Sequence, residues 1–207
     1  MCMRNEENNH NLTHLGVTVS ILYFGLLRCC DATKLEVDDV TIEESGRVMI
    51  NFEHARKQVN HGFKFYVPAV YENLFKKYLS QLKKEKNGKT RFLKNWNMKS
   101  KTRVQNTGRD KVGKAINEFC KLLGISDEGY TSHGFRRSAA TNLADTGVTL
   151  VNLKRHGQWS ADSSAERYLE NSKPIREERE CLLMPQKNQK TRTVMSSQVL
   201  ICVLGLL

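Results

Sequence analysis

Residues 132–136 of this 207-residue chain read Ser-His-Gly-Phe-Arg and open a predicted helix that Thr131 or Ser132 can cap. His133 and Arg136 are three residues apart and therefore share one helix face. A helix N-terminus attracts phosphate through its free N–H groups and its dipole, and a guanidinium beside it can hold two phosphate oxygens. Taken alone, a His-x-x-Arg pair is more often a capping histidine and a surface arginine, so its surroundings must decide.

A second stretch, residues 155–168, reads Arg-His-Gly-Gln-Trp and then, after eight more residues, tyrosine. Thr149 is expected to cap a short helix before the tryptophan, and Ser160 or Asp162 to start the helix that carries Tyr168. A tryptophan among apolar helix residues ordinarily belongs to the core, and a lone tyrosine is ordinarily a half-buried anchor. The spacing of nine residues between the two is what calls for another interpretation.

In this order the two stretches resemble the signature of the tyrosine recombinases, or phage integrase family. In that family His-x-x-Arg is followed by a histidine or tryptophan and, nine residues later, by the nucleophilic tyrosine. The resemblance assigns His133 and Arg136 to the first pair, Trp159 to the His/Trp position and Tyr168 to the nucleophile. His156 is twelve residues from the tyrosine and is rejected for that position. Several matches in order arise by chance far less often than any one of them.

The resemblance extends toward the N-terminus, to the segment Gly-Leu-Leu-Arg-Cys-Cys-Asp-Ala that starts at residue 25. Arg28 matches the family's first catalytic arginine, and Asp31 stands where an acidic residue buttresses it. Ala32 departs from the common leucine, a change in packing rather than in chemistry. The family's hairpin lysine matches Lys57, with Lys64 as a rival.

The resemblance implies that Tyr168 attacks a DNA phosphodiester, giving a 3′-phosphotyrosine and a free 5′-hydroxyl, and that a 5′-hydroxyl from another strand reverses the step. Covalent storage of the bond requires no cofactor. Arg28 and Arg136 would hold the non-bridging oxygens. Lys57 would protonate the departing 5′-oxygen, and His133 would assist proton movement at the tyrosine. The tryptophan would pack against the site and offer its indole N–H.

Periodicity along the rest of the chain predicts a mainly helical α+β domain with one small antiparallel sheet. Apolar residues at helical spacing, with Pro68 at a first helical position and Gly124 and Gly147 as stops, place helices at residues 12–27, 68–82, 111–123 and 133–146. Strand-like stretches occur at residues 47–52 and 63–67, joined as a hairpin, and a turn into a strand at 37–40. The segment between residues 83 and 111 is interpreted as a basic linker.

The formal net charge of +11 is concentrated in and just after that linker. From Lys83 to Lys114 the chain contains twelve basic residues and two acidic ones. With Phe92 and Trp96 interleaved, the run suits a polyanion whose phosphates release counterions on binding. A solvated basic loop is the alternative. From this run and the signature helices, the predicted DNA contacts are Lys83, Lys84, Lys86, Lys89, Arg91, Lys94, Lys99, Lys101, Arg103, Arg137, Lys154 and Arg155.

Composition is that of a soluble globular protein, with 39% apolar and 27% charged residues. The six cysteines form no Cys-x-x-Cys pair, which predicts neither a zinc site nor a disulfide framework and favours a reducing compartment. His10 and His14, four residues apart, are attributed to chance. No signal peptide or membrane span is indicated. We expect double-stranded DNA as the partner, and no metal, cofactor, membrane or small-molecule substrate.

The predicted organisation is an N-terminal remnant at residues 1–16, a catalytic domain at 17–175 and a C-terminal tail at 176–207, disordered or packing on a neighbouring protomer. The helical core-binding domain that family members carry before the catalytic domain is expected to be absent. Residues 134–144 and 153–159, with Asn-Ser-Lys-Pro after the tyrosine, look most like the eukaryotic branch associated with Crypton-type DNA transposons. We expect a nuclear protein, and recombination in the family implies four protomers on DNA.

The sequence therefore predicts DNA strand cleavage and rejoining, in site-specific recombination or DNA integration. A first alternative is a domesticated or fragmentary recombinase domain that only binds DNA or chromatin. A second is a type IB topoisomerase, which uses the same tyrosine and arginine chemistry to relax supercoils without exchanging strands between partners.

Overall fold

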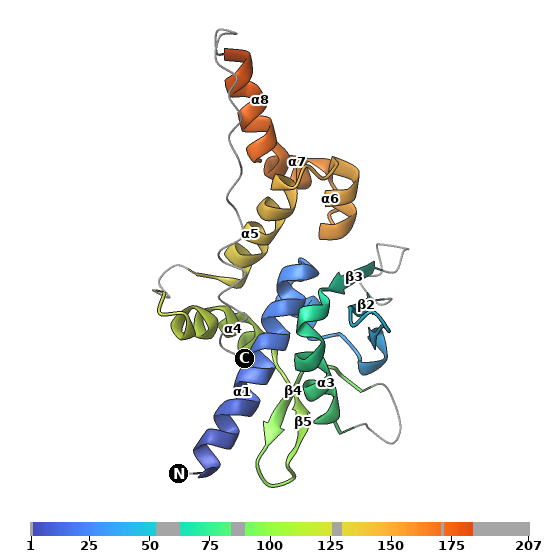
Figure 1. Ribbon diagram of the computed structural model, residues 1–207, viewed down its shortest axis with the longest axis vertical. Helices are drawn as coiled ribbons and strands as arrows, with labels where there is room; N and C mark the ends of the chain where they lie inside the picture. The colour runs from blue at the N-terminus through green and yellow to red at the C-terminus, as the bar shows by residue number, and fades with distance from the viewer. Residues whose placement is uncertain (1, 53–62, 84–89, 126–129, 171, 184–207) are drawn as a thin grey trace.

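The computed structural model describes residues 2–52, 63–83, 90–125, 130–170 and 172–183, and of residues 2–8 and 180–183 it describes the backbone alone. Its organising element is α1 (Cys2–Phe24), a long helix beside which α3, α4 and the strands gather (Figure 1). Val17 and Val19 project from nearly opposite sides of the helix, and both are buried. Neighbours therefore enclose this part of α1 on several sides.

The predicted helix at residues 12–27 is confirmed in its apolar part, but the observed helix begins ten residues earlier and ends at Phe24. The predicted division between residues 16 and 17 thus lies inside α1. The chain then turns through Gly25, where a Cβ atom would lie 2.5 Å from the ring of Phe65. Only glycine fits so close to the sheet, and the end of α1 is fixed by this contact.

The predicted hairpin is confirmed. After the short helices α2 (Cys29–Ala32) and η1 (Val37–Asp39), three antiparallel strands follow in the order β1 (Val40–Ile42), β2 (Val48–Phe52) and β3 (Phe63–Val67). Ile50 pairs with Phe65, and alternate residues of β2 and β3 are buried in the core, where β3 lies against α1. This period of two buries one face of the sheet and leaves the other to solvent.

The helix expected from Pro68 begins as a turn of 3₁₀-helix, η2 (Ala69–Tyr71), and continues as α3 (Glu72–Ser80). A second hairpin follows, made of β4 (Lys94–Asn97) and β5 (Thr102–Asn106). This hairpin corrects the interpretation of the segment as a linker. Its inner positions are occupied by Lys94 and Arg103, whose long stems pack like apolar side chains and give no apolar pattern in the sequence.

The C-terminal half consists of α4 (Arg109–Leu122), α5 (Ser132–Asp145), α6 (Leu150–Gly157), α7 (Asp162–Glu170) and α8 (Lys173–Leu183). Thr131 caps α5 by accepting a hydrogen bond of 3.0 Å from the backbone N–H of Gly134, and Thr149 caps α6. Helix α8 was not predicted: Pro174 lies in its first turn, where proline is tolerated, and the predicted tail boundary at residue 176 falls inside it.

The fold class is the predicted one, mainly helical with small antiparallel sheets, although the described residues form two sheets where one was expected. Helices α5 to α8 form the part of the molecule farthest from the N-terminus, and α8 extends away from the core (Figure 1). Within the described ranges, no helix is both long enough and apolar enough to cross a bilayer.

Candidate active site

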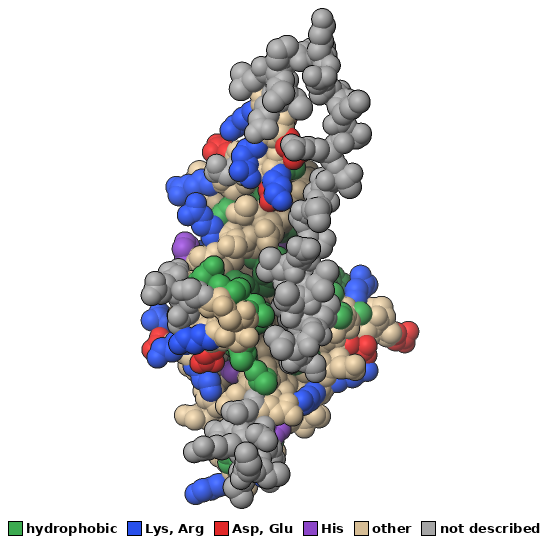
Figure 2. Space-filling view, turned by 60° about the vertical axis from the view of Figure 1, so that its left-hand side comes forward, with side chains coloured by type: hydrophobic (Ala, Val, Ile, Leu, Met, Phe, Trp, Pro, Cys, Tyr) green, Lys and Arg blue, Asp and Glu red, His purple; other side chains and the backbone are tan. Residues whose placement is uncertain are grey.

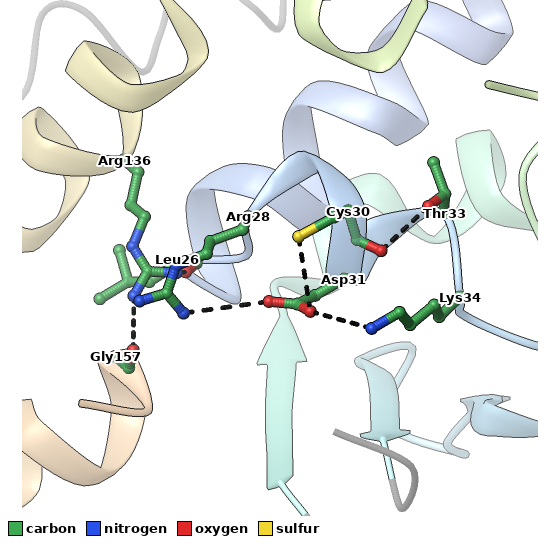
Figure 3. Close-up of polar contacts among 8 residues, drawn as sticks. All are labelled: Leu26, Arg28, Cys30, Asp31, Thr33, Lys34, Arg136 and Gly157. Atoms are coloured by element: carbon green, nitrogen blue, oxygen red, sulfur yellow. Dashed lines mark hydrogen bonds and ion pairs between the residues drawn. The ribbon is translucent and has the colours of Figure 1, made fainter. Parts of the chain in front are cut away.

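The first arginine of the predicted set lies where the chain leaves α1 and enters α2. Leu26 adopts a left-handed backbone conformation (φ 44°), which costs a residue with a Cβ about 1–2 kcal/mol. Two residues later Arg28 occupies the N-cap position of α2, with a guanidinium nitrogen 4.0 Å from a carboxylate oxygen of Asp31. Asp31 is buried and also lies 3.7 Å from the ammonium of Lys34 (Figure 3). This is the buttressing contact that the family resemblance implied.

Arg136, in the second turn of α5, points toward the turn that precedes Arg28. Its side chain is 6% exposed, and its guanidinium donates hydrogen bonds to the carbonyl oxygens of Leu26 and, at 2.5 Å, of Gly157 (Figure 3). One side chain thus joins the turn before Arg28 to the end of α6. Because Leu26 is two residues from Arg28, the two arginines that are far apart in sequence are close in space.

Trp159 and Tyr168 complete the cluster. Gln158 is left-handed (φ 52°) and reverses the chain after α6, so that the indole folds back over Gly157, where a Cβ would be 2.0 Å from a ring carbon. The indole lies between two partners: the guanidinium of Arg136, 5.2 Å from its centroid, and the ring of Tyr168, stacked at 5.1 Å and 28°. Tryptophan supplies a face for both, since cations and aromatic rings are attracted to its π system.

His133 is exposed in the first turn of α5, one turn before Arg136. This places its imidazole on the surface beside the buried arginine, where it can meet a bound molecule. Lys57 lies outside the described residues, although the strands on both sides of its segment are placed. Its rival Lys64 is exposed on β3. The structure therefore brings together Arg28, Arg136, Trp159 and Tyr168 and sets His133 beside them, and their chemical roles remain predictions.

A hollow of about 370 Å³ borders this cluster. It is lined by residues from α2, α4 and the start of α5, namely Cys29, Arg109, Asp110, Gly113, Lys114 and Ser132. Cys29 follows Arg28 and Ser132 precedes His133, so the hollow opens next to both. Its charged lining residues are Arg109, Lys114 and Asp110, which leaves a net positive charge. The two basic residues belong to the run counted in the sequence but are not among the predicted DNA contacts, because only the fold brings the first turns of α4 against α2 and α5.

The predicted DNA contacts divide into several groups. Five of them are exposed. In the surface view of the whole molecule, Lys and Arg side chains gather over the part that holds α5 to α8 and at the level of α4 (Figure 2). The exposed five are Lys83, Lys99, Lys101, Arg137 and Arg155. Lys154 pairs with Asp162, and Arg91 donates to the carbonyl of Lys34 at 2.5 Å. Lys84, Lys86 and Lys89 lie outside the described residues.

Lys94 and Arg103 are corrections to that prediction, because they are 1% and 0% exposed and do not reach the surface. Arg103 lies 4.4 Å above the ring of Tyr78 and donates to the side chain of Gln81 at 3.0 Å and the carbonyl of His10 at 2.6 Å. Its contacts fasten the β4–β5 hairpin to α1 and α3. This arginine therefore stabilises the core, and burial lowers its pKa.

Metal ligands do not gather in the described part of the chain, where no group of three or more histidine, cysteine, aspartate or glutamate side chains is arranged to hold an ion. The charged groups of the site are the two arginines with their acidic neighbour. What the arrangement can do chemically is bind an anion between guanidinium groups next to a tyrosine hydroxyl.

Two arginines beside a stacked tryptophan and tyrosine, on a mainly helical domain, make up the arrangement that the resemblance to the tyrosine recombinases implied. Residues 2–174 match the model of the Phage integrase family, and the chain therefore belongs to that family. Among curated proteins none matches the chain.

Solved structures share the fold. The crystal structure of XerA recombinase superposes with a TM-score of 0.62 at 16% identity, over 88% of this chain and 60% of that one. XerH site-specific recombinase, bound to a palindromic difH substrate in a post-cleavage complex, gives 0.61 at 19%, over 86% and 52%. The Tn1549 transposon integrase with transposon right end DNA gives 0.55 at 17%, over 83% and 59%. The chain thus spans between half and three fifths of these proteins.

Proposed function

We propose that the chain cuts and rejoins DNA strands through a covalent bond between Tyr168 and a 3′-phosphate. The observation that carries the proposal is the series of contacts from the guanidinium of Arg136 to the ring of Trp159 and from that ring to Tyr168, next to the Arg28–Asp31 pair. Family membership supports it, as do two solved relatives: XerH after cleavage of its difH substrate, and an integrase on transposon end DNA.

In the proposed step the phenol oxygen of Tyr168 forms a bond to phosphorus while the bond from phosphorus to the 5′-oxygen breaks. The proton of the phenol passes toward His133, and the departing 5′-oxygen takes a proton from Lys57. Arg28 and Arg136 hold the non-bridging oxygens, whose charge grows in the transition state. A 5′-hydroxyl then attacks the phosphotyrosine, which restores the phenol and joins the strands.

A nicked suicide duplex, from which the short 5′-hydroxyl fragment diffuses away, tests the proposal by trapping the covalent adduct. We expect an adduct with the wild type and none with Tyr168→Phe. Tyr130→Phe is the matched control, because Tyr130 is 48% exposed and belongs to none of the contacts that define the site. No adduct with the wild type, or equal adducts with wild type and Tyr168→Phe, would contradict the proposal.

Two further assays separate the outcomes. Exchange of strands between two labelled duplexes is expected of a recombinase, and relaxation of a supercoiled plasmid without exchange would instead indicate a type IB topoisomerase. DNA binding without any adduct would indicate a binding module.

We propose further that the chain derives from a Crypton-type transposon recombinase, acts in the nucleus and assembles as a tetramer on DNA. The support is the sequence of residues 134–144 and 153–159, which resembles that branch, and the transposon origin of one solved relative. Imaging of a tagged chain tests the location. The mass of the complex on a target duplex tests the assembly, and a monomer at saturating DNA would contradict it.

A further inference from the structure

Two strained turns deliver the proposed catalytic residues. Leu26 precedes Arg28 by two residues, Gln158 directly precedes Trp159, and both are left-handed without being glycine. Such conformations persist only where surrounding contacts over-determine them. The contacts that hold these two turns together should therefore decide whether the arginine and the aromatic pair face one another correctly.

His156, in the last turn of α6, makes contacts with segments that flank both turns. Its Nε2 atom lies 2.7 Å from the carbonyl oxygen of Phe24, at the end of α1. Its ring meets the ring of Phe63 edge to face, with centroids 5.6 Å apart at 73°. Phe63 is the first residue of β3, so the imidazole touches the end of α1, the sheet and, through its own backbone, the segment that leads to Trp159.

The hydrogen bond fixes what His156 can do. A carbonyl oxygen only accepts, so Nε2 carries the hydrogen and donates it. Burial lowers the pKa of His156, and the bond to Phe24 opposes that effect in part. The imidazole is therefore neutral at neutral pH, and its Nε2–H is committed to a backbone oxygen and not to DNA.

We propose that His156 is a positioning residue for strand cleavage: it fastens the end of α6 to the end of α1 and so sets Trp159 and Tyr168 relative to Arg28. This inference rests on the proposed function. Arg136 spans the same two turns through Leu26 and Gly157, but its guanidinium is also assigned to the phosphate. His156 holds the ends of α1 and α6 together without touching the reacting atoms. Sequence reasoning considered it only for the His/Trp position and had no further use for it.

The test compares His156→Gln, whose amide can still donate to the Phe24 carbonyl, with His156→Leu, which keeps the apolar contact and loses the donor. At saturating suicide duplex, we expect the Leu variant to form adduct about 10- to 100-fold more slowly, because misplacing reacting groups by about 1 Å costs on that order. The Gln variant should stay within about threefold of the wild type, and the DNA Kd of both within about twofold.

His14→Leu is the matched control. It also removes a buried histidine hydrogen bond, 3.2 Å to the hydroxyl of Tyr78, but in a part of the core outside the site. At a temperature where all variants are folded, His14→Leu should form adduct at the wild-type rate. Equal slowing by His14→Leu and His156→Leu, or a Leu variant as fast as the wild type, would overturn the inference.

A readout without DNA completes the test. In a Trp96→Phe background Trp159 is the remaining tryptophan, and its emission should shift in the Leu variant and not in the Gln variant. Failure of the wild type to form any adduct would overturn the proposed function together with the catalytic part of this inference. Unchanged emission in the Leu variant would overturn the positioning role by itself.

Discussion

The part of the molecule around α1 and the part made of α5, α6 and α7 are packed in different ways. Around α1, one large cluster of buried aliphatic and aromatic side chains joins the sheet, α3 and α4. In the described part of α5 to α7 the buried clusters are small and rich in alanine, with Leu143, Trp159 and Tyr168 only half-buried against them. Polar bonds from Arg136, Asn142 and His156 connect these helices to the end of α1 and the turn after it, beside a small apolar cluster of Leu26 with two alanines of α5. The part around α1 is therefore held mainly by apolar burial, whereas directed polar contacts contribute a larger share where α5 to α7 join it.

The largest expected effect is on the apolar part. Phe75 is fully buried on α3 and stacks on Phe92 at 6.2 Å, so Phe75→Ala should lower the free energy of unfolding by about 3–5 kcal/mol through lost burial and a cavity. Leu143 on α5 is half-buried, so Leu143→Ala should lower the free energy of unfolding by roughly 1–2 kcal/mol. Urea unfolding measures both. Equal losses would show that the two parts do not differ in packing.

Acid should also act first on the part around α1. Burial, with smaller contributions from the charges of Arg103 and Lys111, lowers the pKa of His14 from 6.5 to about 3. Between these values the unfolded chain binds a proton that the folded chain does not. Stability is therefore full above pH 6.5 and falls as the pH drops toward 3, by about 2 kcal/mol at pH 5.

Urea unfolding at pH 7, 6 and 5 measures this loss, and His14→Leu is the control. The variant should lose much less stability on acidification, keeping a smaller dependence from His156, whose pKa burial also lowers. Parallel curves for wild type and variant would contradict the assignment to His14.

A smaller effect is expected at the turn between α6 and α7. Gly157→Ala would place a Cβ 2.0 Å from the indole of Trp159. It should cost roughly 1 kcal/mol, the lower end of the range for overpacking, because the half-buried indole can move. That movement should separate the indole from Tyr168 and slow adduct formation more than the lost stability alone explains.

Gly113→Ala is the matched control for stability alone, since a Cβ there meets nothing within 4 Å and alanine favours the interior of α4 by about 0.5–1 kcal/mol, whereas Gly113 lines the hollow beside the site. Thermal unfolding measures both variants, and the suicide duplex compares Gly157→Ala with the wild type. Normal adduct formation by Gly157→Ala would show that the aromatic stack tolerates displacement.

The same contrast explains what the sequence could predict. The site residues of α5 were readable because Thr131 and Gly147 mark the ends of one helix and His133 and Arg136 stand at a fixed spacing within it. The directed contacts were not readable. The bonds from Arg136 to Leu26 and Gly157 span 110 and 21 residues, and no local pattern encodes such a bond.

The second hairpin escaped prediction for a related reason. Lys94 and Arg103 each have a charged head and a long apolar stem, so the sequence alone does not tell whether the side chain lies on the surface or in the core, where the structure places both. Arg103 buries its guanidinium on the rings of Tyr78 and Trp96, whereas a charge pattern assigns it to the surface. Counting charges therefore overstates the DNA-facing surface and misses a core element.

The smallest expected effect concerns two neighbouring basic residues of α6. Lys154 pairs with Asp162 at the start of α7, and such a partly exposed pair contributes at most about 1 kcal/mol. Arg155 is exposed, and no acidic side chain among the described residues forms an ion pair with it. If the ammonium of Lys154 is committed to Asp162, Lys154→Met should leave the salt dependence of DNA binding nearly unchanged. Arg155→Met should reduce the slope of log Kd against log salt by about one, the loss of one phosphate contact.

Equal slopes for both variants would mean that DNA displaces Asp162 from Lys154, and the polar contact between α6 and α7 would then belong to the free protein alone.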